Sequence, residues 1–289
     1  MKPLTLLLIL LSLPLRAEEV LNVSAVISLD MENDNFGGFS SLVVAPDGGS
    51  FFATSDRGYF FLADIVRGNG NIVGLSSLML TPIVDTKGQP LTGLHTDAEG
   101  LAFGPNGEIY MSFEGNHRIM VQNRIVDLPE FLPKHPEFRT LINNSGLEAL
   151  AVDALGVVFA IPERSGDYEA PFPVYRLLDD GWNRDWSLPR RGDYLVTGAD
   201  IFNGQLYILE RDLVGLRGFS SRIRRFDIGE GLTGEQTLLT TAAGTYDNLE
   251  GISVWQNEAG EVRVLLISDD NFRFFQKNQL VEMVLEASN

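Results

Sequence analysis

The chain has 289 residues, no cysteine and a formal net charge of −17. Without cysteine, the fold cannot use disulfides and must be stable through packing alone, which a closed β architecture can provide. The strong acidity makes nucleic acid and anionic membranes poor partners.

The first predicted element is an apolar segment at residues 4–15, preceded by Lys2 and followed by Ala17. This layout is typical of a secretory signal peptide, and the segment is short for a membrane span. We expect residues 1–17 to be removed and residues 18–289 to form one periplasmic or secreted domain. An uncleaved anchor is the alternative. No later segment is long and apolar enough to cross a bilayer.

One pattern then recurs along the mature chain: an apolar strand, a turn with glycine, a second apolar strand and an acid. The position of the first acid is occupied in successive copies by Ser40, Glu99, Glu148, Asp200 and Glu250. These positions lie about 50 to 60 residues apart, close to the 40–50 residues of a four-stranded propeller blade. Repetition at this period predicts stacked copies of one structural unit.

We therefore expect an all-β fold, a single β-propeller of about five blades. Residues 21–29 alternate like a strand and are expected to pair with residues 279–285, which closes the ring. A sixth blade within residues 72–83 is the alternative count. A β-sandwich fits less well, because it gives no reason for acids at regular intervals.

The hairpin turns predict where the acids meet. Glu99 and Glu114 lie almost symmetrically about the turn Pro105-Asn106-Gly107, so folding the hairpin brings both to its open end. The same argument applies to three more pairs, Glu148 with Glu163, Asp200 with Glu210, and Glu250 with Asp269. The first copy has Asp56 alone, because Ser40 occupies the first position. Every copy is thus expected to direct carboxylates to one rim.

Several of these segments together resemble a known family. They are residues 39–42 (FSSL) with 55–58 (SDRG), 98–101 (AEGL), 146–150 (GLEAL), and 248–252 (NLEGI) with 267–272 (ISDDNF). This combination resembles the phytase-like domain of exported bacterial proteins that is named for the esterase-like activity of phytase. The resemblance covers nearly all of the mature chain. It implies a propeller that hydrolyses esters or phosphoesters, related in idea to calcium-dependent propeller phytases.

Carboxylates that converge on one rim repel each other unless they take up protons or a cation. Oxygen ligands without cysteine and with few histidines suit Ca²⁺ or Mg²⁺ better than Zn²⁺. The predicted Ca²⁺ ligands are Glu99, Glu148, Glu250 and Asp269, with Asp56, Glu163, Glu114 and Glu210 as further candidates. The alternative is that these acids bind backbone amides or pair with arginines.

Arginines accompany the second acid of the copies. Arg57, Arg164 and Arg211 follow it directly, and Arg118 follows four residues later. Guanidinium groups bind phosphate or carboxylate through two parallel hydrogen bonds, so these four are the predicted substrate-binding residues. Ion pairs between blades are the alternative role for each of them.

For a hydrolase, these residues predict a water nucleophile activated by a metal ion, with Glu99 or Glu148 as base and His95 as proton donor. The sequence has neither a Gly-x-Ser-x-Gly motif nor a phosphate-binding P-loop. We expect a monomer that acts on a small anionic or ester substrate. A lactonase of the gluconolactonase type and a non-enzymatic periplasmic binding or scaffold protein are the alternatives.

Overall fold

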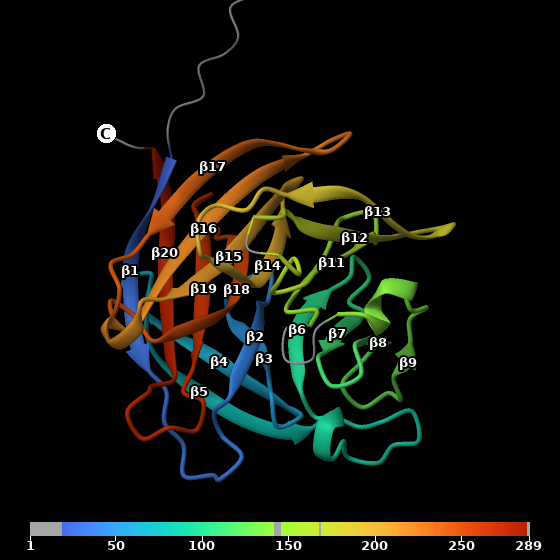
Figure 1. Cartoon of the computed structure of the whole chain (residues 1–289). Coiled ribbons are helices and arrows are strands. Elements are labelled where there is room, and N and C mark those ends of the chain that lie inside the picture. Colours follow the sequence, from blue (N-terminus) through green and yellow to red (C-terminus); the bar gives the residue numbers. More distant parts are fainter. Residues whose placement is uncertain (1–18, 142–145, 168, 288–289) are drawn as a thin grey trace, which may run out of the picture.

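A computed structural model describes residues 19–141, 146–167 and 169–287 (Figure 1). The predicted signal segment 1–17 lies outside them. The described residues contain no α-helix, and their strands form five four-stranded antiparallel sheets arranged as a β-propeller, as the repeat predicts. None of the described helical turns is long and apolar enough to span a membrane.

Four blades are built from consecutive strands. Blade 1 comprises β2 (Phe39–Val44), β3 (Ser50–Ser55), β4 (Tyr59–Gly68) and β5 (Asn71–Pro82). Blade 2 comprises β6 (Ala98–Phe103), β7 (Ile109–Phe113), β8 (Arg118–Gln122) and β9 (Glu130–Phe131). Blade 3 comprises β10 (Ala149–Val152), β11 (Val158–Ile161), β12 (Phe172–Leu178) and β13 (Gly181–Leu188). Blade 4 comprises β14 (Leu195–Phe202), β15 (Gln205–Leu213), β16 (Phe219–Ile228) and β17 (Leu232–Thr240).

Blade 5 joins the two ends of the chain. Its strands are β18 (Asn248–Gln256), β19 (Val262–Asp269), β20 (Gln279–Ala287) and β1 (Glu19–Ser28). The register runs from Glu19 opposite Ala287 to Ser28 opposite Gln279. This confirms the predicted closure of the ring. Residues 71–82 form β5, the outer strand of blade 1, so the six-bladed alternative is wrong.

The first strand of each blade lies nearest the centre of the ring. Strands β2, β6, β10, β14 and β18 contact each other in this order, and β18 contacts β2 (Figure 1). They approach too closely for large side chains at some positions. A Cβ atom on Gly100 would lie 2.6 Å from the Leu150 Cβ, and one on Gly251 would lie 2.8 Å from the Leu42 nitrogen. These contacts explain why glycine directly follows Glu99 and Glu250.

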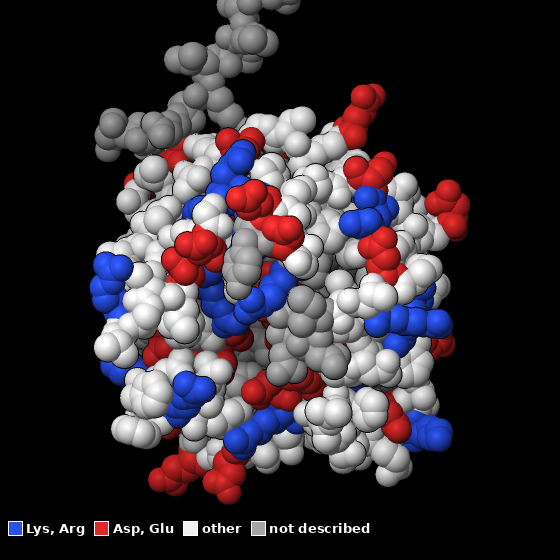
Figure 2. Space-filling view, in the orientation of Figure 1, with Lys and Arg blue, Asp and Glu red and all other residues white. Residues whose placement is uncertain are grey.

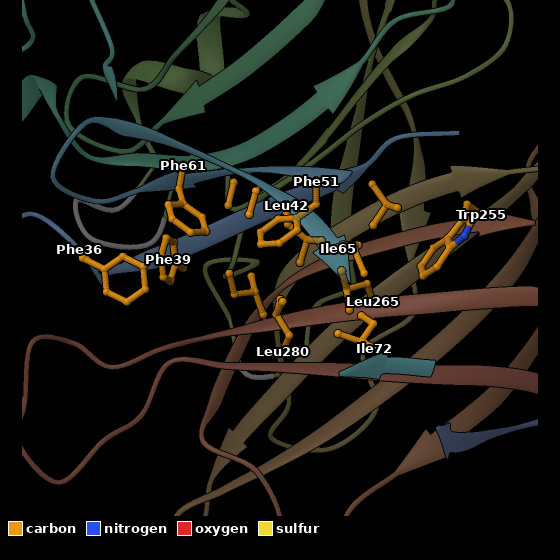
Figure 3. Close-up of a cluster of buried hydrophobic side chains, with 14 residues drawn as sticks. Phe36, Phe39, Leu42, Phe51, Phe61, Ile65, Ile72, Trp255, Leu265 and Leu280 are labelled. Atoms are coloured by element: carbon orange, nitrogen blue, oxygen red, sulfur yellow. The ribbon is translucent and has the colours of Figure 1, made fainter. Parts of the chain in front are cut away.

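The hydrophobic core lies between the blades. Each of five buried clusters combines residues from two neighbouring blades. In the cluster between blades 1 and 5, Phe39, Phe51 and Phe61 pack near Leu265 and Leu280 (Figure 3). Burial of apolar area at every interface is the main source of stability for a ring without disulfides.

Candidate functional site

Each innermost strand carries an extra residue opposite its hairpin partner. The register shifts by one at Ser40, Glu99, Thr197 and Glu250. Blade 3 has an equivalent arrangement. The Glu163 amide donates to the Gly146 carbonyl, and Ala149 lies opposite Ile161, so Glu148 occupies the position of the extra residue. Such β-bulges redirect a side chain without ending the strand. The bulged residue therefore marks the first repeating position.

The second repeating position is the last residue of each hairpin at the same end. It is occupied by Asp56, Glu114, Glu163, Arg211 and Asp269. We call the ten residues at these two positions the inner ring. It contains seven carboxyl groups and one guanidinium group, since Ser40 and Thr197 carry hydroxyls. The electrostatic coupling among these groups places them around a common centre.

The structure corrects the prediction for blade 4. Asp200 lies opposite Tyr207 near the hairpin turn, and its carboxylate accepts hydrogen bonds from the Val254 and Ile201 amides at 2.6 and 2.7 Å. Glu210 is completely buried and contacts arginines of β16. Thr197 and Arg211 occupy the two ring positions instead. Counting from the turn fails here because each strand of this hairpin is one residue longer than in blade 2, so the ring positions lie one residue further from the turn.

Burial and mutual repulsion raise the pKa values of the carboxyl groups in the inner ring. Burial is the largest cause, and repulsion by neighbouring carboxylates adds to it. The pKa of Glu99 is raised well above its usual range. The pKa values of Asp56 and Glu114 are raised to about 7, and that of Asp269 to about 8. Without a cation, part of the ring therefore holds protons near neutral pH.

On the blade 4 side, Arg211 supplies an internal counter-ion. Its guanidinium forms ion pairs with Glu250 and, at 3.2 Å, with Glu163. The Asn248 side chain completes the contact, since its amide donates to Glu250 at 2.8 Å and its oxygen accepts from Arg211. Nearby carboxylates raise the already high pKa of Arg211 further, against the effect of its burial. This side of the ring is neutralised by the protein itself.

On the blade 2 side, carboxylates meet without such a partner. Oxygen atoms of Asp97, Glu99 and Glu114 lie within 4.8 Å of one another, close enough to hold one metal ion. Among the described residues, no Lys, Arg or His forms an ion pair with any of the three. Burial is the largest cause that raises the pKa of Asp97, and the Arg118 guanidinium nearby opposes it. We call these three residues the acidic cluster.

The acidic cluster only partly matches the predicted ligand set. Of the four predicted metal ligands, Glu99 alone belongs to it, and of the further candidates, Glu114. The predicted ligands Glu148, Glu250 and Asp269 and the candidates Asp56 and Glu163 lie elsewhere on the inner ring. Sequence reasoning missed Asp97. Its signal was its place just before the first acid of the copy, since the Asp97 carbonyl accepts from the Glu114 amide at 3.0 Å at the open end of the hairpin.

The four predicted substrate-binding arginines have different surroundings. Arg57 stacks on the Phe272 ring at 3.2 Å from the centroid and donates to the Asp34 carbonyl. Arg118 is buried and donates to the carbonyls of Gly115 and His95 at 2.8 and 2.7 Å. Both guanidinium groups thus hold loops in place.

Arg164 and Arg211 remain accessible to a ligand. They line a pocket of about 400 Å³ together with Glu163, Asn248 and Arg273. Within the described part of the chain, the exposed Arg164 guanidinium forms an ion pair with its neighbour Glu163 alone, at 3.2 Å. Around the middle of this face, basic and acidic side chains lie next to each other (Figure 2). The face is therefore amphoteric, in keeping with the predicted alternation of acids and arginines.

His95 lies in a 3₁₀ turn, η1 (Gly93–His95), two residues before Asp97. Its imidazole is exposed and makes no hydrogen bond or ion pair with the described part of the chain. Its backbone amide donates to the Thr92 carbonyl, and its backbone carbonyl accepts from Arg118. Its role as a proton donor remains a prediction.

Solved structures with a similar fold share little sequence with this chain. The aldose sugar dehydrogenase of Streptomyces coelicolor, in its PQQ-bound form, is 13% identical with a TM-score of 0.52, covering 94% of this chain and 99% of that one. An α-L-arabinofuranosidase of Podospora anserina in complex with cellotriose is 10% identical with a TM-score of 0.52, covering 93% and 97%. At these identities the likeness concerns the fold alone.

No curated protein sequence matches the chain. A family model does match it, over residues 34–272, which include the inner strands of all five blades and the whole inner ring. The model is described as phytase-like, esterase-like activity of phytase. The chain therefore belongs to the phytase-like family, as the segments around its repeated acids indicate.

Proposed function

We propose that this protein is a metal-dependent hydrolase of esters or phosphoesters, with its site at the acidic cluster. The observation that carries the proposal is the convergence of three carboxyl groups within 4.8 Å without a cationic side chain paired to any of them. Like charges at this distance are costly unless protons or a cation compensate them. Family membership supports an ester or phosphoester as the substrate.

The donor atoms favour a hard cation. Asp97, Glu99 and Glu114 offer only carboxylate oxygens, which suit Ca²⁺ or Mg²⁺. Near the cluster, the buried Oδ1 atom of Asp56 has no hydrogen-bond partner among the described residues, and burial together with repulsion by Asp97 raises the pKa of Asp56. This unpaired buried oxygen supports the binding of a cation by the inner ring. We propose Ca²⁺ as the ion.

A bound divalent cation would polarise the substrate oxygen and lower the pKa of water. The chain's own residues would complete the reaction. Glu148 lies next to the ring centre, where burial and neighbouring carboxylates raise its pKa, which suits it to take a proton from the attacking water. Arg164 and Arg211 are placed to bind an anionic group. The sequence of residues 1–17 supports action outside the cytoplasm, in the periplasm or after secretion.

The test is hydrolysis of p-nitrophenyl acetate, p-nitrophenyl phosphate and phytate, before and after metal removal with EDTA. We expect Ca²⁺ to restore turnover of at least one substrate. Asp97→Asn should lower turnover about 10–100-fold, as for changes around a metal site. The matched control is Asp127→Asn, which removes a half-buried carboxylate paired with Arg124 and should have no effect.

Two results would overturn the proposal. Turnover that survives both EDTA and Asp97→Asn would exclude the acidic cluster as the site. A calcium-dependent rise in melting temperature without turnover of any substrate would favour a non-enzymatic binding or scaffold protein with a structural ion. Preferential hydrolysis of gluconolactone would favour the lactonase alternative.

A further inference from the structure

A second pocket continues from the inner ring between blades 4 and 5. Its volume is about 570 Å³, within the range of small-molecule sites, and its lining includes Leu216, Phe219, Tyr246 and Phe275. It shares Leu213, Phe219, Arg273 and Gln276 with the pocket that reaches Arg211. The two pockets therefore form one continuous groove, which we call the blade 4–5 groove.

Hydrogen bonds hold together the three segments that form the walls of the groove, which directly precede β16, β18 and β20. The Gly244 amide, before β18, donates to the Phe219 carbonyl at the start of β16 at 2.8 Å. The Asp247 carboxylate, also before β18, accepts from the Lys277 amide at 2.8 Å and from the Gln276 side chain at 3.1 Å, both before β20. A groove held in this way needs little reorganisation to receive a ligand.

Apolar side chains are unusually exposed at this groove. Leu216 is fully exposed at the 3₁₀ turn η3 (Gly215–Arg217), and Leu213 and Phe275 are each 62% exposed. All three line the same pocket. Exposed apolar side chains gathered around one concave surface mark binding sites more often than isolated ones do. They would bury an alkyl chain or an aromatic ring.

Two cations stand beside this apolar surface. Arg273 and Lys277 line the pocket, and among the described residues neither forms an ion pair through its side chain. Asp247 is the one carboxylate among the lining residues, and it is occupied by the loop hydrogen bonds. The lining of this second pocket thus carries a net positive charge in a protein of charge −17. An anionic group is favoured here, although the whole molecule repels it at long range.

We propose that the blade 4–5 groove binds a small anionic amphiphile, an ester whose alkyl or aryl part packs against Leu216 and Phe275 while its anionic group pairs with Arg273 and Lys277. The assignment of this ligand as the substrate rests on the proposed hydrolase function. The groove would then direct the ester toward Arg211 and the inner ring.

Calorimetric titration below the micelle concentration tests the pocket without turnover. The probes are octylphosphonate, methylphosphonate, which lacks the tail, and octyl glucoside, which lacks the charge. We expect octylphosphonate to bind about tenfold more tightly than either, a difference that corresponds to about 1.4 kcal/mol. Equal affinity for octylphosphonate and methylphosphonate, or for octylphosphonate and octyl glucoside, would overturn the proposal.

Two neighbouring phenylalanines give a matched pair of variants. Phe275 lines the pocket, whereas Phe274 is more exposed and does not line it. Both lie in a surface loop, so neither change threatens the fold. Phe275→Ser should weaken octylphosphonate binding about tenfold, and Phe274→Ser should leave it nearly unchanged. Equal losses in the two variants would show non-specific adsorption and overturn the proposal.

The charge and the link to catalysis are tested separately. Arg273→Gln with Lys277→Gln should weaken octylphosphonate but not octyl glucoside, and equal losses of both would contradict the anionic assignment. Titrations in EDTA should keep the preference for the octyl chain. If this preference persists but no ester is hydrolysed, the hydrolase proposal fails and the groove stands. If esters are hydrolysed without preference for an anionic octyl ester, the groove proposal fails alone.

Discussion

The two sides of the inner ring face the same electrostatic problem and differ in how it is solved. On the blade 4 side, Arg211 replaces an acid and pairs with Glu163 and Glu250. On the blade 2 side, Asp97, Glu99 and Glu114 converge without an ion-paired cation among the described residues, and burial raises the pKa values of all three. The same structural repeat therefore forms an internal ion pair in one blade and a site that needs an added cation in another.

The largest effect on stability is expected from removing Arg211, the internal counter-ion on the blade 4 side. Arg211→Met leaves Glu163 and Glu250 buried without their partner, which should cost about 3–5 kcal/mol. The melting temperature should fall by about 10 °C. Arg164→Met is the control, because its exposed pair with Glu163 is worth less than about 1 kcal/mol. Equal shifts in the two variants would show that Arg211 is no internal counter-ion.

The next largest effect concerns pH and calcium. Ring carboxyls such as Asp56, Glu114 and Asp269 have pKa values of about 7 to 8 in the folded protein, above their ordinary values near 4. The folded state then binds more protons than the unfolded state between about pH 4 and 8. The contribution of these groups to stability is therefore full below pH 4 and is lost as the pH rises through 7 to 8.

Calcium should reverse this loss, because it replaces the protons of the acidic cluster. We expect EDTA-treated protein to melt at a lower temperature at pH 8 than at pH 5. Saturating Ca²⁺ should raise the melting temperature by about 5 °C at pH 8 and by less at pH 5. Differential scanning calorimetry at both pH values measures this, and a calcium shift independent of pH would argue against a carboxylate site.

A smaller effect distinguishes the two sides directly. Without metal at pH 8, Glu99→Gln should raise the melting temperature by a few degrees, because it removes one of the repelling carboxylates of the acidic cluster. The same variant should lose the calcium shift. Glu148→Gln should keep most of that shift, since Glu148 lies outside the cluster. Loss of the calcium shift in Glu148→Gln but not in Glu99→Gln would contradict the acidic cluster and support a site that contains Glu148, one of the ligands predicted from the sequence.

The smallest effect is expected at Arg57. Its guanidinium stacks on Phe272 at the surface, a contact worth about 0.5–1 kcal/mol. Arg57→Ala should lower the melting temperature by about 2 °C and leave both the calcium shift and turnover unchanged. A large rise in KM with an unchanged melting temperature would instead support the substrate-binding role that its position after Asp56 predicts.

The sequence by itself determined the fold class, the ring closure and the recurrence of acids at one end of the hairpins. Strand alternation, glycine turns and the repeat period are local signals, and all copies carry them. Glycine follows Glu99 and Glu250 because the inner strands approach each other closely there. This close approach is therefore also visible in the sequence. Local turn chemistry also gave the correct hairpin partners in four of the five blades.

Only the tertiary structure decided which acids meet. Each strand of the blade 4 hairpin is one residue longer than in blade 2, so that Arg211 occupies the ring position and Glu210 pairs with arginines of β16. A shift of one residue reverses every side chain of a strand, and no local pattern reveals it. Asp97, Glu99 and Glu114 meet because they lie at the open end of one hairpin, whereas the distance from them to Glu148 of blade 3 depends on how the ring closes.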